Sequence, residues 1–270
     1  MNNDNTKIQN SVIKIETKKF NELTIFEKII RVFEIFDINK EEIPLILKWF
    51  DINFYDLFVN EESFKKKVSP DLIRFLSKNF KINLQAFYGN DRELIKINTI
   101  GFYKNVKNFS DNIASILKSE DSYLYILSES IPCKENEEEN NFILLIKRPL
   151  FNVPETQKQV YTFDIYHDGC WWGYWKCRYN LKSLLIYLRK KHQVHFSKIT
   201  GYSMGDGLIG NMYSFSEGNL PIKEFFNPMR ASIWYPEDYI EFPSENINAR
   251  ESDELQLVLD EINKGKWVWY

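Results

Sequence analysis

The sequence of 270 residues predicts an α+β fold, in which a segment of short helices precedes a larger domain of helices and strands. Two observations support this prediction. Between residues 23 and 94, apolar residues recur at three- and four-residue steps, the period of amphipathic helices. Beyond residue 95, apolar and aromatic runs typical of strands lie between helical patterns. We therefore expect a polar arm at 1–22, an all-α domain at 23–95 and an α+β domain at 96–270.

The all-α domain is expected to contain five short helices. The first begins near Ile25, and breaks at 37–39 and 51–53 separate it from a second and a third. Ser69 and Pro70 form a favourable start for the fourth helix, because serine caps free amides and proline fits the first turn. The fifth helix is short and closes on a glycine.

The α+β domain is centred on residues 160–178, where two aromatic, alternating runs flank the dipeptide Asp168-Gly169. This dipeptide suits the positive φ angles of a two-residue turn, so the sequence predicts an antiparallel hairpin with His167 opposite Cys170. The hairpin is expected to be the centre of an antiparallel meander. The other elements expected in this domain are helices at 104–118, 181–192 and 251–263 and strands at 122–130, 142–150, 194–202 and 231–235.

The composition argues against several classes of protein. Three cysteines are too few for a secreted disulfide framework, and the polar N-terminus lacks the apolar region of a signal peptide. No apolar run approaches the roughly 20 residues that cross a bilayer. We therefore expect a cytoplasmic protein without a membrane partner. The abundance of Asn, Lys, Ile and Phe is typical of an AT-rich bacterial or phage genome, and the net charge of −3 gives no overall basic footprint.

Two of the expected helices, at 39–50 and 53–61, form a closely spaced pair. A helix begun by proline and a short helix closed by glycine follow it. Over residues 23–94 the chain resembles the lambda-repressor/Cro-like (XRE-type) helix-turn-helix domain. The resemblance implies that Ile52 and Leu57 hold the apolar positions that lock the pair of helices together.

Three residues depart from the pattern of that family. Lys40 stands where the family usually has glutamine, Pro44 where it has a small residue, and Asp51 where it has glycine. Proline is tolerated in the first turn of a helix and breaks it further along, so the position of Pro44 in its helix is decisive.

The resemblance implies that the helix at 53–61 reads duplex DNA as part of a homodimer. Its implied recognition residues are Asn53, Phe54, Tyr55 and Asn60. The two asparagines present a donor and an acceptor that suit adenine edges, and a basic run after the helix would contact phosphates. That run is Lys65, Lys66 and Lys67. The alternative interpretation is a helical bundle that serves only protein contacts.

Residues 167–195 contain all three histidines and two of the three cysteines. His167 and Cys170 are expected to be neighbours across the hairpin, and with His195 they are the candidate zinc ligands. Cys170 and Cys177 are expected on opposite faces of one strand, and neither a C-x₂-C nor an H-x₃-H spacing occurs. Buried thiols and surface histidines are therefore the favoured interpretation, and no cofactor is expected.

Two further patterns bear on ligand binding. Trp171, Trp172, Tyr174 and Trp175 supply flat rings that can line a ligand pocket, although core packing is the simpler explanation for most of them. Residues 205–210 match G-x-G-x-x-G, but the residues that follow do not predict the helix on which this motif seats phosphate. We therefore expect a chance match to the motif or a simple flexible turn there.

Taken together, these patterns predict a non-enzymatic transcription regulator with two domains. Its expected partners are double-stranded DNA, a second copy of the chain, and a small-molecule or protein effector sensed by the C-terminal domain. Two alternatives stay open. One is a protein-interaction module without DNA binding, such as a phage-defence or immunity component, and the other is a small zinc-dependent enzyme.

Overall fold

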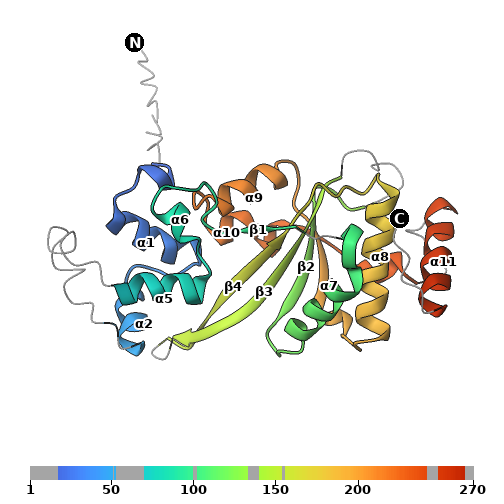
Figure 1. Cartoon of the computed structure of the whole chain (residues 1–270), viewed down its shortest axis with the longest axis horizontal. Helices are drawn as coiled ribbons and strands as arrows, with labels where there is room; N and C mark the ends of the chain where they lie inside the picture. Colours follow the sequence, from blue (N-terminus) through green and yellow to red (C-terminus); the bar gives the residue numbers. More distant parts are fainter. Residues whose placement is uncertain are drawn as a thin grey trace, which may run out of the picture.

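A computed structural model describes residues 18–50, 52, 70–99, 102–132, 140–153, 156–241 and 249–264. It confirms the α+β class, because helices at the N-terminal end precede a six-stranded mixed sheet that carries further helices (Figure 1). Within the described residues, no helix is long and apolar enough to cross a membrane.

Four of the five helices expected near the N-terminus are confirmed, and the one expected at 53–61 lies outside the described residues. They are α1 (Ile25–Ile35), α2 (Ile43–Trp49), α5 (Pro70–Phe80) and α6 (Leu84–Phe87), preceded by a 3-10 turn, η1 (Phe20–Glu22). The start of α1 is a capping box, in which Thr24 and Glu27 each accept a hydrogen bond from the other's amide. Pro44 lies in the first turn of α2, where it removes no helical hydrogen bond.

The sheet has the strand order β1-β4-β3-β2-β5-β6. Its strands are β1 (Ile97–Asn98), β2 (Tyr123–Ser128), β3 (Phe142–Val153), β4 (Lys158–Tyr166), β5 (Ile199–Ser203) and β6 (Ser232–Trp234). β2, β3 and β4 form an antiparallel meander, β1 is parallel to β4, β5 is parallel to β2, and β6 is antiparallel to β5. The strands predicted at 122–130, 142–150 and 231–235 are confirmed. Of the strand predicted at 194–202 only the last part is β5, which follows a 3-10 turn, η2 (Phe196–Lys198).

The hairpin predicted at 160–178 is wrong in its second half. The first run is β4, but after Asp168-Gly169 the chain enters α8 (Trp175–Lys190). β4 pairs with β3 on one side and β1 on the other, so its edges are already occupied. Trp171 makes only an isolated bridge, to Asn141. The start of α8 resembles a strand in sequence because this helix is buried almost all round and shows no polar face.

The other helices are α7 (Phe102–Leu117), α9 (Leu208–Ser216), α10 (Ile222–Phe225) and α11 (Ala249–Asn263), with 3-10 turns η3 (Pro228–Arg230) and η4 (Pro236–Tyr239). The helices predicted at 104–118, 181–192 and 251–263 are confirmed in α7, α8 and α11, with shifted ends. A turn does form at 206–207, but the expectation that no helix follows the motif is wrong. Gly205 and Gly207 adopt φ angles of 80° and 87°, but α9 begins directly after them.

Two hydrophobic clusters cover the two faces of the sheet. The first joins the N-terminal helices, α9 and α10 to one face, and it includes residues on both sides of residue 95, such as Phe80 and Phe151. The second joins α7, α8 and α11 to the other face. Figure 1 shows the same arrangement, with α1, α2, α5 and α6 at one end of the molecule and α8 and α11 at the other.

Candidate functional site

The residues implied in DNA recognition all lie outside the described part of the chain. These are Asn53, Phe54, Tyr55, Asn60, Lys65, Lys66 and Lys67. The structure does place the two ends of the segment that contains them. The Phe50 ring at the end of α2 lies 4.6 Å from the Phe75 ring of α5, and the Ile52 amide donates to the Leu47 carbonyl. The end of α2 is therefore packed against α5.

The N-terminal helices are joined to the sheet at the same place. The Phe50 and Trp49 rings lie 5.3 and 5.7 Å from the ring of Phe151 in β3. The Lys158 ammonium of β4 pairs with Glu42 at 2.9 Å. An aromatic cluster at the end of α2 and an ion pair at its start thus join α2 to the β3–β4 hairpin.

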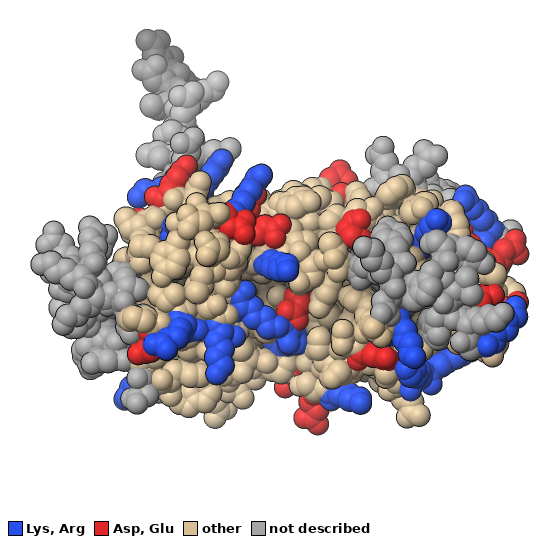
Figure 2. All heavy atoms as spheres, in the orientation of Figure 1, with Lys and Arg blue, Asp and Glu red and all other residues tan. Residues whose placement is uncertain are grey.

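Two runs of three consecutive cations occur in the sequence, at 65–67 and at 189–191. In the second run, Arg189 pairs with Glu241 and Lys191 pairs with Asp111. Figure 2 shows cationic and anionic side chains interspersed over the described part of one face. That face therefore offers no broad basic surface for phosphate groups.

The four aromatic residues proposed for ligand binding are divided between core and surface. Trp172 is 2% exposed and packs edge-on against the rings of Trp234 and Tyr239. Trp171 is 39% exposed and stacks on Tyr174 at 5.2 Å. Trp175, at the start of α8, contacts Tyr179 and Lys176. Trp171 is thus the most exposed ring of this group, and it stacks on the half-buried Tyr174.

The candidate zinc ligands are not brought together. His167 approaches the Phe142 carbonyl, and burial lowers its pKa. Cys170 donates to Asp168 at 3.0 Å, whereas His195 caps η2 through the Ser197 amide. Among the described residues, no group of three or more potential ligands is placed to hold a metal ion.

Cys170 and Cys177 are not on opposite faces of a strand, because Cys177 belongs to α8. Both are thiols and fully buried, and they are close enough to hydrogen-bond to each other. That hydrogen bond, burial and the neighbouring Asp168 raise the pKa of Cys170. Since the thiolate is the reactive form, these two thiols are chemically protected.

A Cys133→Ser variant is therefore expected to show no fast-reacting thiol with a disulfide reagent in native buffer. Both remaining thiols, Cys170 and Cys177, should react only when the protein is unfolded with urea. The measurement is the time course of reagent release in both conditions. Rapid reaction of either thiol in native buffer would contradict the buried position.

Five polar-tipped side chains gather on one face of the sheet, on the strands β4, β3, β2 and β5. We call them the tyrosine–lysine face: Tyr123, Tyr125, Lys147, Tyr161 and Tyr202. Lys147 is paired directly with Tyr123 across β3 and β2, so the two side chains share a face. Tyr125 is two residues further along β2 and points the same way.

The other two tyrosines extend this face to the neighbouring strands. Tyr161 of β4 is paired with Pro149, two residues from Lys147. Tyr202 of β5 is paired with Leu127, which shares the alternation of the β2 tyrosines. One continuous row therefore crosses four strands, on the face that the N-terminal helices cover elsewhere.

The rings of this face are packed together and the lysine lies among them. The Lys147 ammonium is 3.7 Å from the ring centroid of Tyr161 and 5.9 Å from that of Tyr123. The Tyr123 and Tyr125 rings are parallel within 3°, and Tyr125 and Tyr202 lie edge to face at 5.6 Å. Burial lowers the pKa of Lys147 and raises the pKa of Tyr125, Tyr161 and Tyr202, so these phenols remain hydrogen-bond donors at neutral pH.

Sequence reasoning missed the tyrosine–lysine face. A signal was present within one strand, because Tyr123 and Tyr125 are separated by one residue and alternation places them on one face. The partners Lys147, Tyr161 and Tyr202 could not be added, since the register between strands fixes them and the second half of the expected hairpin does not form.

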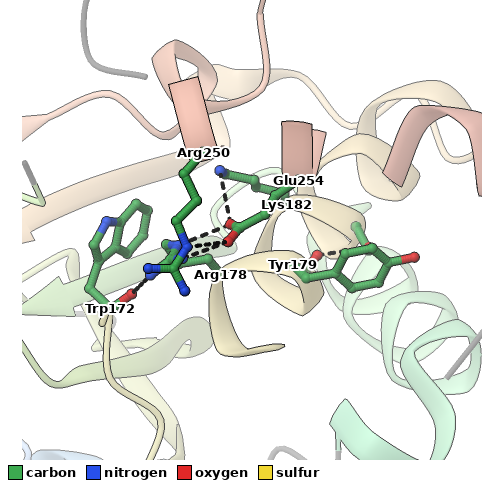
Figure 3. A network of polar contacts seen from close by, with 7 residues as sticks. Trp172, Arg178, Tyr179, Lys182, Arg250 and Glu254 are labelled. Carbon is green, nitrogen blue, oxygen red and sulfur yellow. Dashed lines mark hydrogen bonds and ion pairs between the residues drawn. The ribbon is translucent and has the colours of Figure 1, made fainter. Parts of the chain in front are cut away.

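A buried ionic network joins α8 to α11 (Figure 3). Arg178 is 0% exposed and contacts both carboxylate oxygens of Glu254, through Nε at 3.0 Å and Nη2 at 2.6 Å. Its Nη1 donates to the Trp172 carbonyl at 2.6 Å. The Lys182 ammonium, also buried, lies 3.8 Å from Glu254, and Arg250 approaches the same carboxylate from the surface at 3.9 Å. The network fixes α11 on the helix layer.

Comparisons with models of protein families, with curated proteins and with solved structures gave no match to this chain.

Proposed function

We propose that the chain is a DNA-binding transcription regulator, in which the N-terminal helices carry the DNA-reading segment and the α+β part senses an effector. The observation that supports this most directly is the 4.6 Å contact between the rings of Phe50, at the end of α2, and Phe75 of α5, which packs together the described helices on either side of residues 53–69. A reading helix needs such a rigid support to hold its side chains against base edges. The coupling of α2 to the β3–β4 hairpin supplies a route from effector to DNA.

The combined variant Asn53→Ala/Asn60→Ala is expected to lose at least about 10-fold in affinity for its preferred duplex. Each asparagine–adenine pair contributes about 1–3 kcal/mol of discrimination, so selectivity between duplexes should fall as well. The measurement is fluorescence anisotropy with genomic duplex fragments, followed by the selected site, over a salt series. Asn112→Ala/Asn152→Ala is the matched control, because both of these asparagines are exposed and lie elsewhere.

The lysine run gives a second, independent readout. Lys65→Gln/Lys66→Gln/Lys67→Gln should weaken all duplexes alike and reduce the slope of log K against log salt by about 0.9 for each phosphate that is no longer neutralised. The control is Lys107→Gln/Lys118→Gln/Lys190→Gln, which removes three exposed lysines of α7, its C-terminal end and α8. If the wild type does not bind duplex DNA at low salt, the proposed function is wrong.

A protein-interaction module without DNA binding is the second candidate. It is favoured by exposed apolar residues in the edge strand β6 and on either side of it, where Met229 is 91%, Ile233 51% and Tyr235 57% exposed. An exposed strand edge with apolar side chains is a common place for a partner. The same DNA titration separates the two candidates, since only the first requires binding to duplex DNA.

A further inference from the structure

The tyrosine–lysine face presents hydrogen-bond donors that the protein itself does not use. Within the described part of the chain, none of its four hydroxyls has a hydrogen-bond partner and the Lys147 ammonium has no ion pair. None of these atoms is among the buried atoms that lack a partner, so all of them reach solvent. The rings beneath are half-buried, which fixes the positions of the hydroxyls.

The ammonium of Lys147 and the four phenol hydroxyls together favour a ligand with a negatively charged oxygen group. A lysine ammonium has donors and no acceptor, and each phenol contributes an O–H donor. Hydrogen bonds to an ionised partner are stronger than neutral ones, so a phosphate gains more here than a neutral ligand. Asp121, exposed at the turn before β2, is the carboxylate that acts on Lys147 and Tyr161, and it does not pair with the ammonium.

The rings add a preference for flat groups. Nucleic-acid bases stack on tyrosine rings, and base–aromatic stacking tolerates any base because every base has a π-face. The row runs from Tyr161 on β4 to Tyr202 on β5, which are three strand spacings apart, or about 14 Å, and Phe226 packs against part of it, at 4.8 Å from Tyr125 and 5.2 Å from Tyr202. That span exceeds one base, so two bases with the phosphate between them match the row better than one.

We infer that the tyrosine–lysine face binds a nucleotide ligand of at least two units, with a phosphate against Lys147 and the bases on the flanking tyrosines. The inference rests on the effector-sensing half of the proposed function and names the chemistry of the effector. The ligand can be a free dinucleotide or a stretch of single-stranded nucleic acid, because both present the same phosphate and bases. Bound next to the β3–β4 hairpin, it is placed to act on the end of α2.

The test uses the full chain and calorimetric titration with four probes: a 5′-phosphorylated dinucleotide, the mononucleotide, inorganic phosphate and a single-stranded hexanucleotide. The dinucleotide should bind saturably and at least about 10-fold more tightly than the mononucleotide, and phosphate alone should be weaker still. A hexanucleotide that binds more tightly than the dinucleotide assigns the face to nucleic-acid strands. Equal affinity of the two assigns it to free dinucleotides.

Lys147→Gln should weaken dinucleotide binding by about 10- to 100-fold, the usual effect of losing a hydrogen bond to a charged group. Tyr123→Phe/Tyr202→Phe keeps both rings and should weaken it about 10-fold by removing two donors. The controls are Lys223→Gln and Tyr213→Phe, which alter exposed residues away from the face. Unchanged thermal unfolding of the Tyr→Phe variant separates ligand binding from folding.

The inference is overturned if the wild type binds none of the four probes at millimolar concentration, or if Lys147→Gln binds the dinucleotide as tightly as the wild type. The nucleotide site and the proposed DNA binding are tested by separate variants, so the failure of one can be distinguished from the failure of the other. Asn53→Ala/Asn60→Ala should keep dinucleotide binding, and Lys147→Gln should keep the wild-type affinity for duplex DNA when no nucleotide is present.

Discussion

Replacing Glu254 by alanine is expected to destabilise the protein by about 3–5 kcal/mol. Its carboxylate holds both the guanidinium of Arg178 and, at longer range, the ammonium of Lys182 (Figure 3). Both cations are almost completely removed from water. Breaking a buried ion pair by removing one partner leaves an uncompensated charge in a poorly polarisable environment, which costs about 3–5 kcal/mol.

The measurement is urea-induced unfolding followed by circular dichroism, with the free energy of unfolding extrapolated to water. Asp253→Ala is the matched control, because it removes an exposed carboxylate from the same helix and should change stability by no more than about 0.5 kcal/mol. Glu254→Gln should lie between the two, since an amide still accepts one hydrogen bond. A loss below about 1 kcal/mol in Glu254→Ala would show that Arg178 and Lys182 are compensated without α11.

The network also shows why the sequence alone could not locate it. The sequence pattern places Arg178 at the end of a hairpin strand, and it places Lys182 in a helix without indicating that this lysine is buried. Neither residue differs in sequence context from a surface cation. Their contacts with Glu254 of α11, about 70 residues later in the chain, are not encoded by any local pattern.

The parts of the fold that the sequence predicts depend on contacts between residues close in the chain, and the parts that it does not predict depend on contacts between distant residues. The capping residues Thr24 and Glu27 and the apolar stripe of α1 act within one helix, so local period and chemistry locate α1 to within a residue. The Asp168-Gly169 dipeptide is compatible with a hairpin but does not require one. The pairing of β4 with β3 and β1 decides the outcome, and the residues near the turn do not reveal that pairing.

The candidate sites also depend partly on local contacts and partly on contacts between distant residues. Tyr123 and Tyr125 are placed on one face by strand alternation alone, whereas their association with Lys147 needs the β2–β3 register. The DNA-reading residues Asn53 and Asn60 come from the order of helices in the sequence, and they stay a prediction.

The second large effect is expected at Gly201 in β5. A Cβ atom there would lie 2.2 Å from Cδ2 and 2.3 Å from Cε2 of Trp234, far inside van der Waals contact. These two residues are direct partners across β5 and β6. Gly201→Ala should therefore destabilise the protein by about 3 kcal/mol, the upper part of the range for overpacked cores.

The ring of Trp234 cannot easily move to make room. Its indole nitrogen donates to the Ser128 hydroxyl at 3.1 Å, and its ring packs edge-on against Trp172 and Tyr239. Displacing it would break a buried hydrogen bond and disturb an aromatic cluster that links β6 to η4 and to the segment before α8. The strain must then be taken up by the β5–β6 pairing, so the exposed edge of the sheet should loosen first.

Gly210→Ala is the matched control, because Gly210 lies in α9 with no atom within 4 Å of the added Cβ. Replacing a helical glycine without a clash should stabilise the protein by about 0.5–1 kcal/mol, a shift opposite in sign to that of Gly201→Ala. A double-mutant cycle with Trp234→Ala tests the cause. If the indole is the obstacle, Gly201→Ala should cost less than about 1 kcal/mol in the Trp234→Ala background. An undiminished cost there would move the cause from the ring to the backbone of β5.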